Sequence, residues 1–115
     1  MGWKLVVVTV RPQLTERIIL IAQRSGAVGA TVIPARGIAT PENRSFLGLA
    51  LDNQRDLILF LLEEPLVPGV TRAVHLDGDL DTPGTGMLFV LDVEQALGLR
   101  EQLAGVETEI REQYN

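Results

Sequence analysis

Apolar and polar positions at the start of the chain predict a strand followed by an amphipathic helix. Trp3 to Val10 is rich in valine with little alternation, which is typical of a strand covered on both faces. Arg11-Pro12 ends this strand, because proline cannot donate to a strand ladder. A helix then runs from Thr15 or Gln13 to about Ser25, and Gly26 ends it. One face of this helix is apolar and consists of Leu14, Ile18, Ile21 and Ala22.

The middle of the chain predicts further strands around a surface loop. Ala30 to Arg36 is the second strand, and Gly37 to Ser45 is a loop because it lacks periodicity and contains Gly, Pro, Asn and Ser. The apolar stretch Phe46 to Leu51 is expected to return as a strand or as the stem of the loop. Arg55 to Leu62 is apolar along almost its whole length, so we expect it at the centre of the sheet.

The second half of the chain predicts a short helix, a strand and a final helix. Pro65, Pro68 and Gly69 are expected to break the chain, so the short helix starts at Val70 and stops at Asp77-Gly78-Asp79. A glycine-containing loop then leads into a strand, Met87 to Leu91, and Val93 to Leu103 is predicted as a helix. Asp92 is the expected N-cap of this last helix, and Glu94 lies in its first turn, where a negative charge suits the helix dipole.

This order of elements predicts an α+β, ferredoxin-like βαββαβ fold, in which helices cover one face of an antiparallel four-stranded sheet. So few helices leave the opposite face of the sheet bare. Because the strands are apolar on both faces, we expect another subunit to cover it. The length of 115 residues suits one domain, which we assign to residues 1–105, followed by a charged C-terminal tail over residues 106–115.

Composition and charge narrow the classes of function. At 46% hydrophobic the chain can build a core, and its ten basic residues are scattered under a net charge of −5, which argues against nucleic acid as a partner. No apolar run approaches the ~20 residues that span a bilayer, so we expect no direct membrane insertion. The absence of cysteine suits a reducing compartment. We therefore expect a cytoplasmic protein.

Candidate catalytic and metal-binding residues are few. His75 is the only histidine, and no cysteine or second histidine completes a transition-metal site. Asp77, Asp79 and Asp81 alternate as in a calcium loop but lack the bidentate glutamate of an EF-hand. No base lies near a serine in the sequence to activate it as a nucleophile. We expect neither an enzyme nor a metal site.

Glycines beside the strands suggest a ligand site. Gly84-Thr85-Gly86 precedes a strand and Gly37 follows one, and glycines there let backbone amides approach an anion closely. A tight turn explains the same pattern. Arg36 and Arg100 could contact phosphate or carboxylate groups, or could simply be solvated surface residues.

Motifs in both halves of the chain follow a familiar order. The first half contains Arg11-Pro12, Gly26 to Val32 and Arg36-Gly37, and the second contains Gly84 to Val93. Together these segments resemble the nitrogen regulatory P-II proteins, over roughly residues 3 to 100. A divergent P-II-like branch, often encoded beside a predicted membrane transport protein, is similar in the motifs Ala35-Arg36-Gly37, Phe46-Leu47-Gly48 and Val93 to Leu99.

The resemblance implies a signal-transduction protein rather than a catalyst. It implies a homotrimer with sheets packed around a central axis, and clefts between subunits that bind small-molecule effectors, typically adenine nucleotides. The cleft residues that it implies here are Thr31, Arg36, Gly37, Ile38, Ala39, Gly84, Thr85, Gly86, Met87 and Arg100. The implied partner-binding segment, the T-loop, regulates a protein such as a membrane transporter and contains Thr40, Pro41, Glu42, Asn43, Arg44, Ser45, Phe46 and Leu47.

Several positions depart from the family pattern. Met87 stands where the family has a phosphate-binding lysine, and Gly98 replaces one of two C-terminal arginines. The T-loop, about Thr40 to Asp52, is shorter than in the family and contains no tyrosine to be uridylylated. Each lost charge-assisted hydrogen bond removes about 1.5–3 kcal/mol, so we expect ATP to bind weakly if it binds.

Two other classes of function stay open at this point. One is a structural or assembly trimer whose clefts hold no effector. The other is a metal-binding protein on the same trimeric scaffold, as in the copper-tolerance CutA family, since a fold does not dictate a function.

Overall fold

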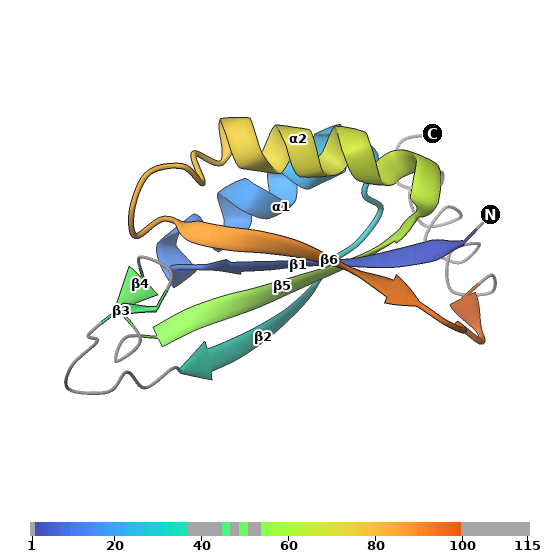
Figure 1. The fold of residues 1–115 in the computed structure, drawn as a ribbon, viewed down its shortest axis with the longest axis horizontal. Helices are drawn as coiled ribbons and strands as arrows, with labels where there is room; N and C mark the ends of the chain where they lie inside the picture. The colour runs from blue at the N-terminus through green and yellow to red at the C-terminus, as the bar shows by residue number, and fades with distance from the viewer. Residues whose placement is uncertain (1, 37–44, 47–48, 51–53, 100–115) are drawn as a thin grey trace, which may run out of the picture.

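Four antiparallel strands form the main sheet of the computed structural model, which describes residues 2–36, 45–46, 49–50 and 54–99 (Figure 1). The strand order is β2-β5-β1-β6, so β5 and β1 are central and β2 and β6 are the edges. The ferredoxin-like α+β fold predicted from the sequence is confirmed. The strands are β1 (Trp3–Val10), β2 (Thr31–Arg36), β5 (Gln54–Glu63) and β6 (Gly86–Val93).

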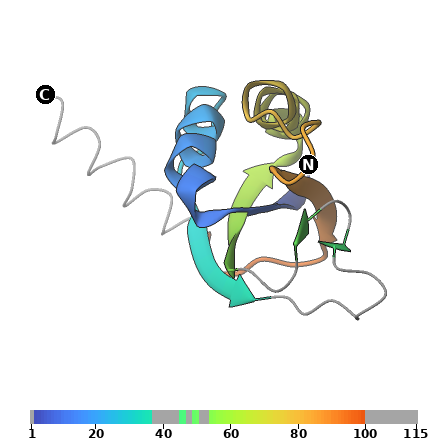
Figure 2. The same cartoon turned by 90° about the vertical axis from the view of Figure 1, so that its left-hand side faces the viewer.

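Two helices cover one face of this sheet, α1 (Thr15–Arg24) and α2 (Val67–Asp77), as Figure 2 shows. Alternate residues of the central strands point toward them, because successive side chains of a strand face opposite sides. The core therefore combines one face of β1 and of β5 with the inner faces of both helices. Its fully buried side chains include Val6, Val8, Val10, Ile18, Ile58, Phe60, Val70 and Val74.

The end of α1 follows the prediction. Gly26 has a φ of 118°, the left-handed region that favours glycine. Its N–H donates to the carbonyl of Gln23 at 3.1 Å, and the N–H of Ala27 donates to the carbonyl of Ala22 at 3.0 Å. These bonds satisfy carbonyl groups that the helix end would otherwise leave without donors.

The start of α2 differs from the prediction, because Pro68 and Gly69 do not break the helix but lie inside its first turn. A 3-10 turn, η2 (Glu64–Leu66), follows β5 directly and leads into α2 at Val67. Proline is tolerated in the first turn, where its missing N–H has no partner within the helix. A similar 3-10 turn, η1 (Pro12–Leu14), joins β1 to α1.

The predicted helix from Val93 is wrong at its start. β6 continues through Asp92 to Val93, and residues 94–98 are not helical. The extension pairs Asp92 with Lys4 across the strands, and their side chains form an ion pair, so Asp92 is not an N-cap. The hydrogen bond with Asp92 raises the pKa of Lys4 above 10.5, although desolvation of the ammonium opposes the rise. The rest of the predicted helix, from Arg100, lies outside the described residues.

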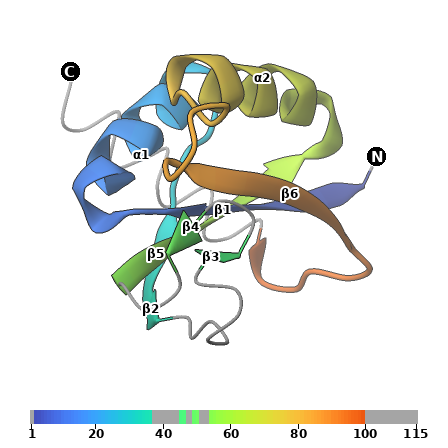
Figure 3. The same ribbon diagram turned by 60° about the vertical axis from the view of Figure 1, so that its left-hand side comes forward.

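The loop region after β2 contains a small hairpin. β3 (Ser45–Phe46) pairs with β4 (Leu49–Ala50) in a separate two-stranded sheet (Figures 1 and 3). The predicted loop therefore gives way to a strand already at Ser45. The apolar stretch that follows is the hairpin rather than a fifth strand of the main sheet.

Neither α1 nor α2 covers the second face of the main sheet, which we call the open face. Its side chains are mostly apolar, and Ile33, Phe89 and Leu91 are 43%, 39% and 48% exposed. The cross-strand register aligns them with Leu5, Val7, Leu57 and Leu59 of the two central strands. On β2, Pro34 lies within an edge strand, the position in a sheet where proline is tolerated.

Candidate functional site

The structure divides the described part of the predicted ligand site between opposite edges of the sheet. Thr31 and Arg36 are the first and last residues of β2, whereas Gly84 to Met87 lead into and begin β6. Two strands lie between these edges, which separates them by about 14 Å at the usual strand spacing. The other predicted residues, Gly37, Ile38, Ala39 and Arg100, lie outside the described residues.

Within one protomer, members of the two groups line separate pockets. Gly86 and Met87 belong to a pocket between α2 and β6, which we call the α2–β6 pocket. Thr31 belongs to a pocket where β1 and β2 begin and β5 ends, which we call the sheet-end pocket.

The sheet-end pocket is mainly apolar and has a volume of about 690 Å³. Trp3, Leu5, Leu61 and Leu66 contribute much of its lining. The only charged side chain that the described residues contribute is that of Glu63. A phosphate group thus finds no cation in the described part of this pocket.

The glycines of the β6 group have structural reasons to be glycine. Gly84 has a φ of 85°, in the left-handed region. At Gly86, a Cβ atom would lie 2.3 Å from the carbonyl oxygen of Thr9, so β1 leaves no room for a side chain. Between them Thr85 is buried, and its N–H donates to the carbonyl of Thr82 at 3.1 Å. The turn and the packing on β1 therefore explain this pattern without a ligand.

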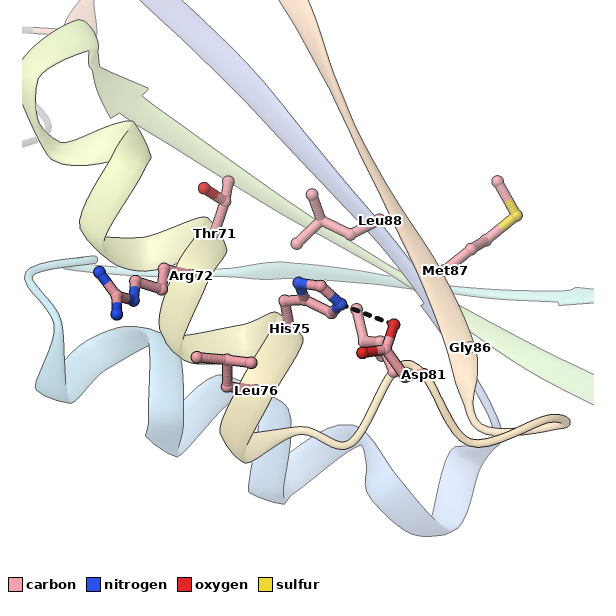
Figure 4. Close-up of a pocket in the computed structure, with 9 residues that line it drawn as sticks. Thr71, Arg72, His75, Leu76, Asp81, Gly86, Met87 and Leu88 are labelled. Atoms are coloured by element: carbon pink, nitrogen blue, oxygen red, sulfur yellow. Dashed lines mark hydrogen bonds and ion pairs between the residues drawn. The ribbon is translucent and has the colours of Figure 1, made fainter.

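Met87 lies on the open face rather than against the helices. Figure 4 shows its side chain on the far side of β6 from His75, while that of Leu88 points toward α2. Leu88 packs against the core, as the alternation along a strand requires. An effector bound at the open face would thus meet a thioether here, where the resemblance leads us to expect a lysine.

The predicted partner-binding loop and the glycine loop emerge at the same end of the sheet. The register aligns Pro34, Asp56, Val10 and Gly86 in one row across the four strands. The hairpin of β3 and β4 lies on the chain between the end of β2 and the start of β5, and so at this end (Figure 3). Of the predicted loop, Ser45 and Phe46 form β3, whereas Thr40 to Arg44 and Leu47 lie outside the described residues.

The α2–β6 pocket has a volume of about 610 Å³ and contains polar residues that sequence reasoning missed or set aside (Figure 4). Arg72 and His75 are three residues apart on α2 and line the pocket together. His75 Nε2 lies 2.7 Å from Asp81 Oδ1 of the following turn. The helical spacing of Arg72 and His75 was a usable signal, but their position beside β6 depends on the tertiary fold.

Neither a metal cluster nor a membrane-spanning helix is found in the part of the chain that the structure describes. In residues 2–36, 45–46, 49–50 and 54–99, no three His, Asp or Glu side chains gather closely enough to hold a metal ion. The helices of the same residues are too short or too polar to cross a bilayer.

Comparison with solved structures finds the same fold in another protein. A crystal structure from Thermus thermophilus, described as that of a PII-like signaling protein, superposes with a TM-score of 0.58. The two sequences are 23% identical, and the match covers 81% of this chain and 91% of the other. At this identity the likeness establishes a shared fold. No family model and no curated protein sequence matches the chain.

Proposed function

We propose that this chain is a P-II-like signal-transduction protein that works as a cytoplasmic homotrimer. In this proposal it binds a small-molecule effector at clefts between subunits, with a weakly bound adenine nucleotide as the first candidate. The loop after β2 then regulates a partner protein, for which a membrane transporter is the first candidate. The fold shared with a PII-like signaling protein supports this class of function and a regulator rather than an enzyme.

The observation that carries the proposal is the division of the predicted ligand residues between two sheet edges. Thr31 lies at one edge and Gly86 at the other, in separate pockets of one protomer. In a closed ring, the β2 edge of one copy meets the β6 edge of the next, and the two groups then line one cleft.

The exposed apolar residues of the open face favour such an assembly. Ile33, Phe89 and Leu91 are each more than one-third exposed. Burying a fully exposed side chain of this size is worth about 1.5–3 kcal/mol. These three are already more than half buried, so covering each contributes less than half of that value, and together they supply a driving force for association. A patch of this kind on an isolated protomer would also promote aggregation.

Regulation follows from the shared position of the two loops. The glycine loop and the segment after β2 emerge at the same end of the sheet. An effector bound between subunits there would stabilise some conformations of the segment over others, and this difference in affinity is the signal.

The assembly is tested by measuring molar mass in solution. We expect a trimer at micromolar concentration by sedimentation or light scattering, and we expect Phe89→Asp to dissociate it, because a carboxylate cannot be buried cheaply at an apolar interface. Leu20→Asp is the matched control, since Leu20 is exposed on α1, away from the open face. A folded wild-type monomer, or a Phe89→Asp protein that stays trimeric, would contradict the proposed assembly.

The effector is tested separately by calorimetry with ATP, ADP and AMP. We expect weak binding, because Met87 stands where the resemblance implies a phosphate-binding lysine and the sheet-end pocket adds no cation. A trimer that gives no heat with any of them would contradict the nucleotide proposal and favour an assembly protein. A stoichiometric transition metal in the purified protein would instead favour the CutA-like alternative.

A further inference from the structure

The sheet-end pocket takes in one end of the open face, and much of its apolar lining is uncovered in one protomer. Val28, Leu61 and Leu66 line it, and each is more than one-third exposed. Trp3 and Leu5 of β1 add apolar surface to the same pocket. Contact of such side chains with water is unfavourable. An apolar occupant would therefore stabilise this part of the molecule.

The chain itself enters this pocket at Leu99. Leu99 is the last described residue, and its half-buried side chain is part of the lining. Leu97, two residues earlier, is 84% exposed. Between them Gly98 has a φ of 78°, in the left-handed region that favours glycine, and Leu99 begins a helix. The turn at Gly98 thus takes the chain from a leucine in solvent to a leucine in the pocket.

The sequence beyond Leu99 has the pattern of an amphipathic helix. Apolar residues follow at spacings of three or four positions and share one helical face with Leu99, namely Leu103, Val106 and Ile110. Thr108 falls on the opposite side of such a helix. An amphipathic helix of this length is only marginally stable in water unless its apolar face packs against another surface. The segment therefore needs an apolar surface, and the pocket that holds Leu99 offers one.

The length of the segment matches the width of the pocket. As a helix, residues 99–110 extend about 17 Å. The neighbouring strands β2, β5 and β1 span about 10 Å from the first to the third, so the segment can lie across all three. Since Leu99 is already in the pocket, the next turns of the same chain reach it at a high effective concentration. A second copy of the chain has no such advantage.

We propose that residues 100–110 pack as an amphipathic helix over the sheet-end pocket of their own protomer, with their apolar face against Trp3 and Leu61. Thr31 also lines this pocket and belongs to the cleft of the proposed function. The segment and an effector at Thr31 therefore compete, and the apparent affinity for the effector falls with the fraction of protomers whose pocket is vacant. This competition rests on the proposed function, whereas the packing of the segment does not.

The fluorescence of Trp3 tests the packing in the intact protein, because Trp3 is the only tryptophan and lines the pocket. We expect Leu103→Asp to shift the emission to longer wavelength and to increase quenching by acrylamide, because a carboxylate cannot be buried cheaply against apolar side chains. Ile110→Asp, on the same face, should repeat the effect. Thr108→Asp is the matched control, since it adds the same charge about 140° around the helix from Leu103, and should leave the signal unchanged.

The packing is overturned if Leu103→Asp and Ile110→Asp leave the Trp3 signal as in the parent, or if Thr108→Asp changes it equally. It is also overturned if the shielding of Trp3 is lost on dilution together with an oligomer, because a neighbouring subunit would then be what covers the pocket.

Calorimetry with AMP tests the competition on the same variants. Leu103→Asp should bind AMP more tightly than the parent, and Thr108→Asp should bind it equally well. Equal affinities in all three proteins would refute the competition. A monomeric parent, or one that binds no nucleotide, would contradict the proposed function instead, and the Trp3 comparison would still decide whether the segment occupies the pocket.

Discussion

Replacing Gly86 by alanine tests whether this glycine is set by the fold or by a ligand. The added Cβ atom would lie 2.3 Å from the carbonyl oxygen of Thr9 and 2.7 Å from Val10 Cγ1. The first of these contacts is more than 1 Å inside the ordinary van der Waals range, which begins at 3.4 Å. It involves the backbone of β1, which is paired on both sides, so the strand cannot easily move away.

The expected cost follows from measured effects of overpacking. Forcing an extra carbon into a closely packed site destabilises a protein by about 1–3 kcal/mol. In a domain of about 100 residues each kcal/mol lowers the melting temperature by about 4–8 °C, so we expect Gly86→Ala to melt about 4–24 °C below the parent protein. Gly29→Ala is the matched control, because a Cβ atom at Gly29 would have nothing within 4 Å. It should be neutral, or stabilising by about 0.4–1 kcal/mol through the unfolded state.

Urea unfolding of the three proteins at one protein concentration measures the difference, since association would otherwise change the apparent stability. Equal stability of Gly86→Ala and Gly29→Ala would refute the reasoning, because it would mean that β1 and β6 are not as close at Gly86 as the structure has them. If Gly86→Ala kept its stability but lost effector binding, the glycine would be required by a ligand instead.

Two further predictions concern polar contacts that tie the elements together. Thr15 Oγ1 donates to Asp56 Oδ2 at 2.6 Å, so Thr15→Val should cost about 1–3 kcal/mol in urea unfolding, and an unchanged midpoint would contradict this bond. Lys4 is the only lysine, and its pKa is raised above 10.5, chiefly by its hydrogen bond with Asp92. The stability difference between the parent and Asp92→Asn should therefore be constant from neutral pH to about pH 10.5 and shrink above it, whereas a difference that persists in thermal melts at higher pH would contradict the pairing.

The order of the elements was enough to predict the fold, but two helix boundaries depended on contacts that local patterns do not contain. Pro68 breaks a helix in the interior and is tolerated in the first turn. The 3-10 turn η2 leads directly into α2 at Val67, so Pro68 lies in the first turn of the helix and not in its interior. Asp92 has the chemistry of an N-cap, but its partner is Lys4, 88 residues away in the sequence. The β1–β6 ladder, which pairs Trp3 with Val93, keeps the chain extended through Val93.

The residues of the candidate site were chosen from the sequence one by one, but their arrangement in space was not predictable. The sequence places Thr31 beside one strand and Gly86 beside another, and only the strand order reveals that these are opposite edges. Arg72 was missed for a related reason. An exposed arginine on a helix has no distinctive pattern, and its position in a pocket depends on β6, which comes later in the chain.

Pro34 has a consequence for how copies of this chain can aggregate. Amyloid-like growth adds strands without limit, and each addition needs an unbroken row of amide hydrogens on the strand that receives it. Proline has no amide hydrogen, so the edge strand β2 lacks one such hydrogen in its middle, at Pro34. Each chain added at the β2 edge would therefore form one backbone hydrogen bond fewer than an unbroken strand allows. This makes fibril growth at that edge less favourable than assembly into a closed complex of fixed size.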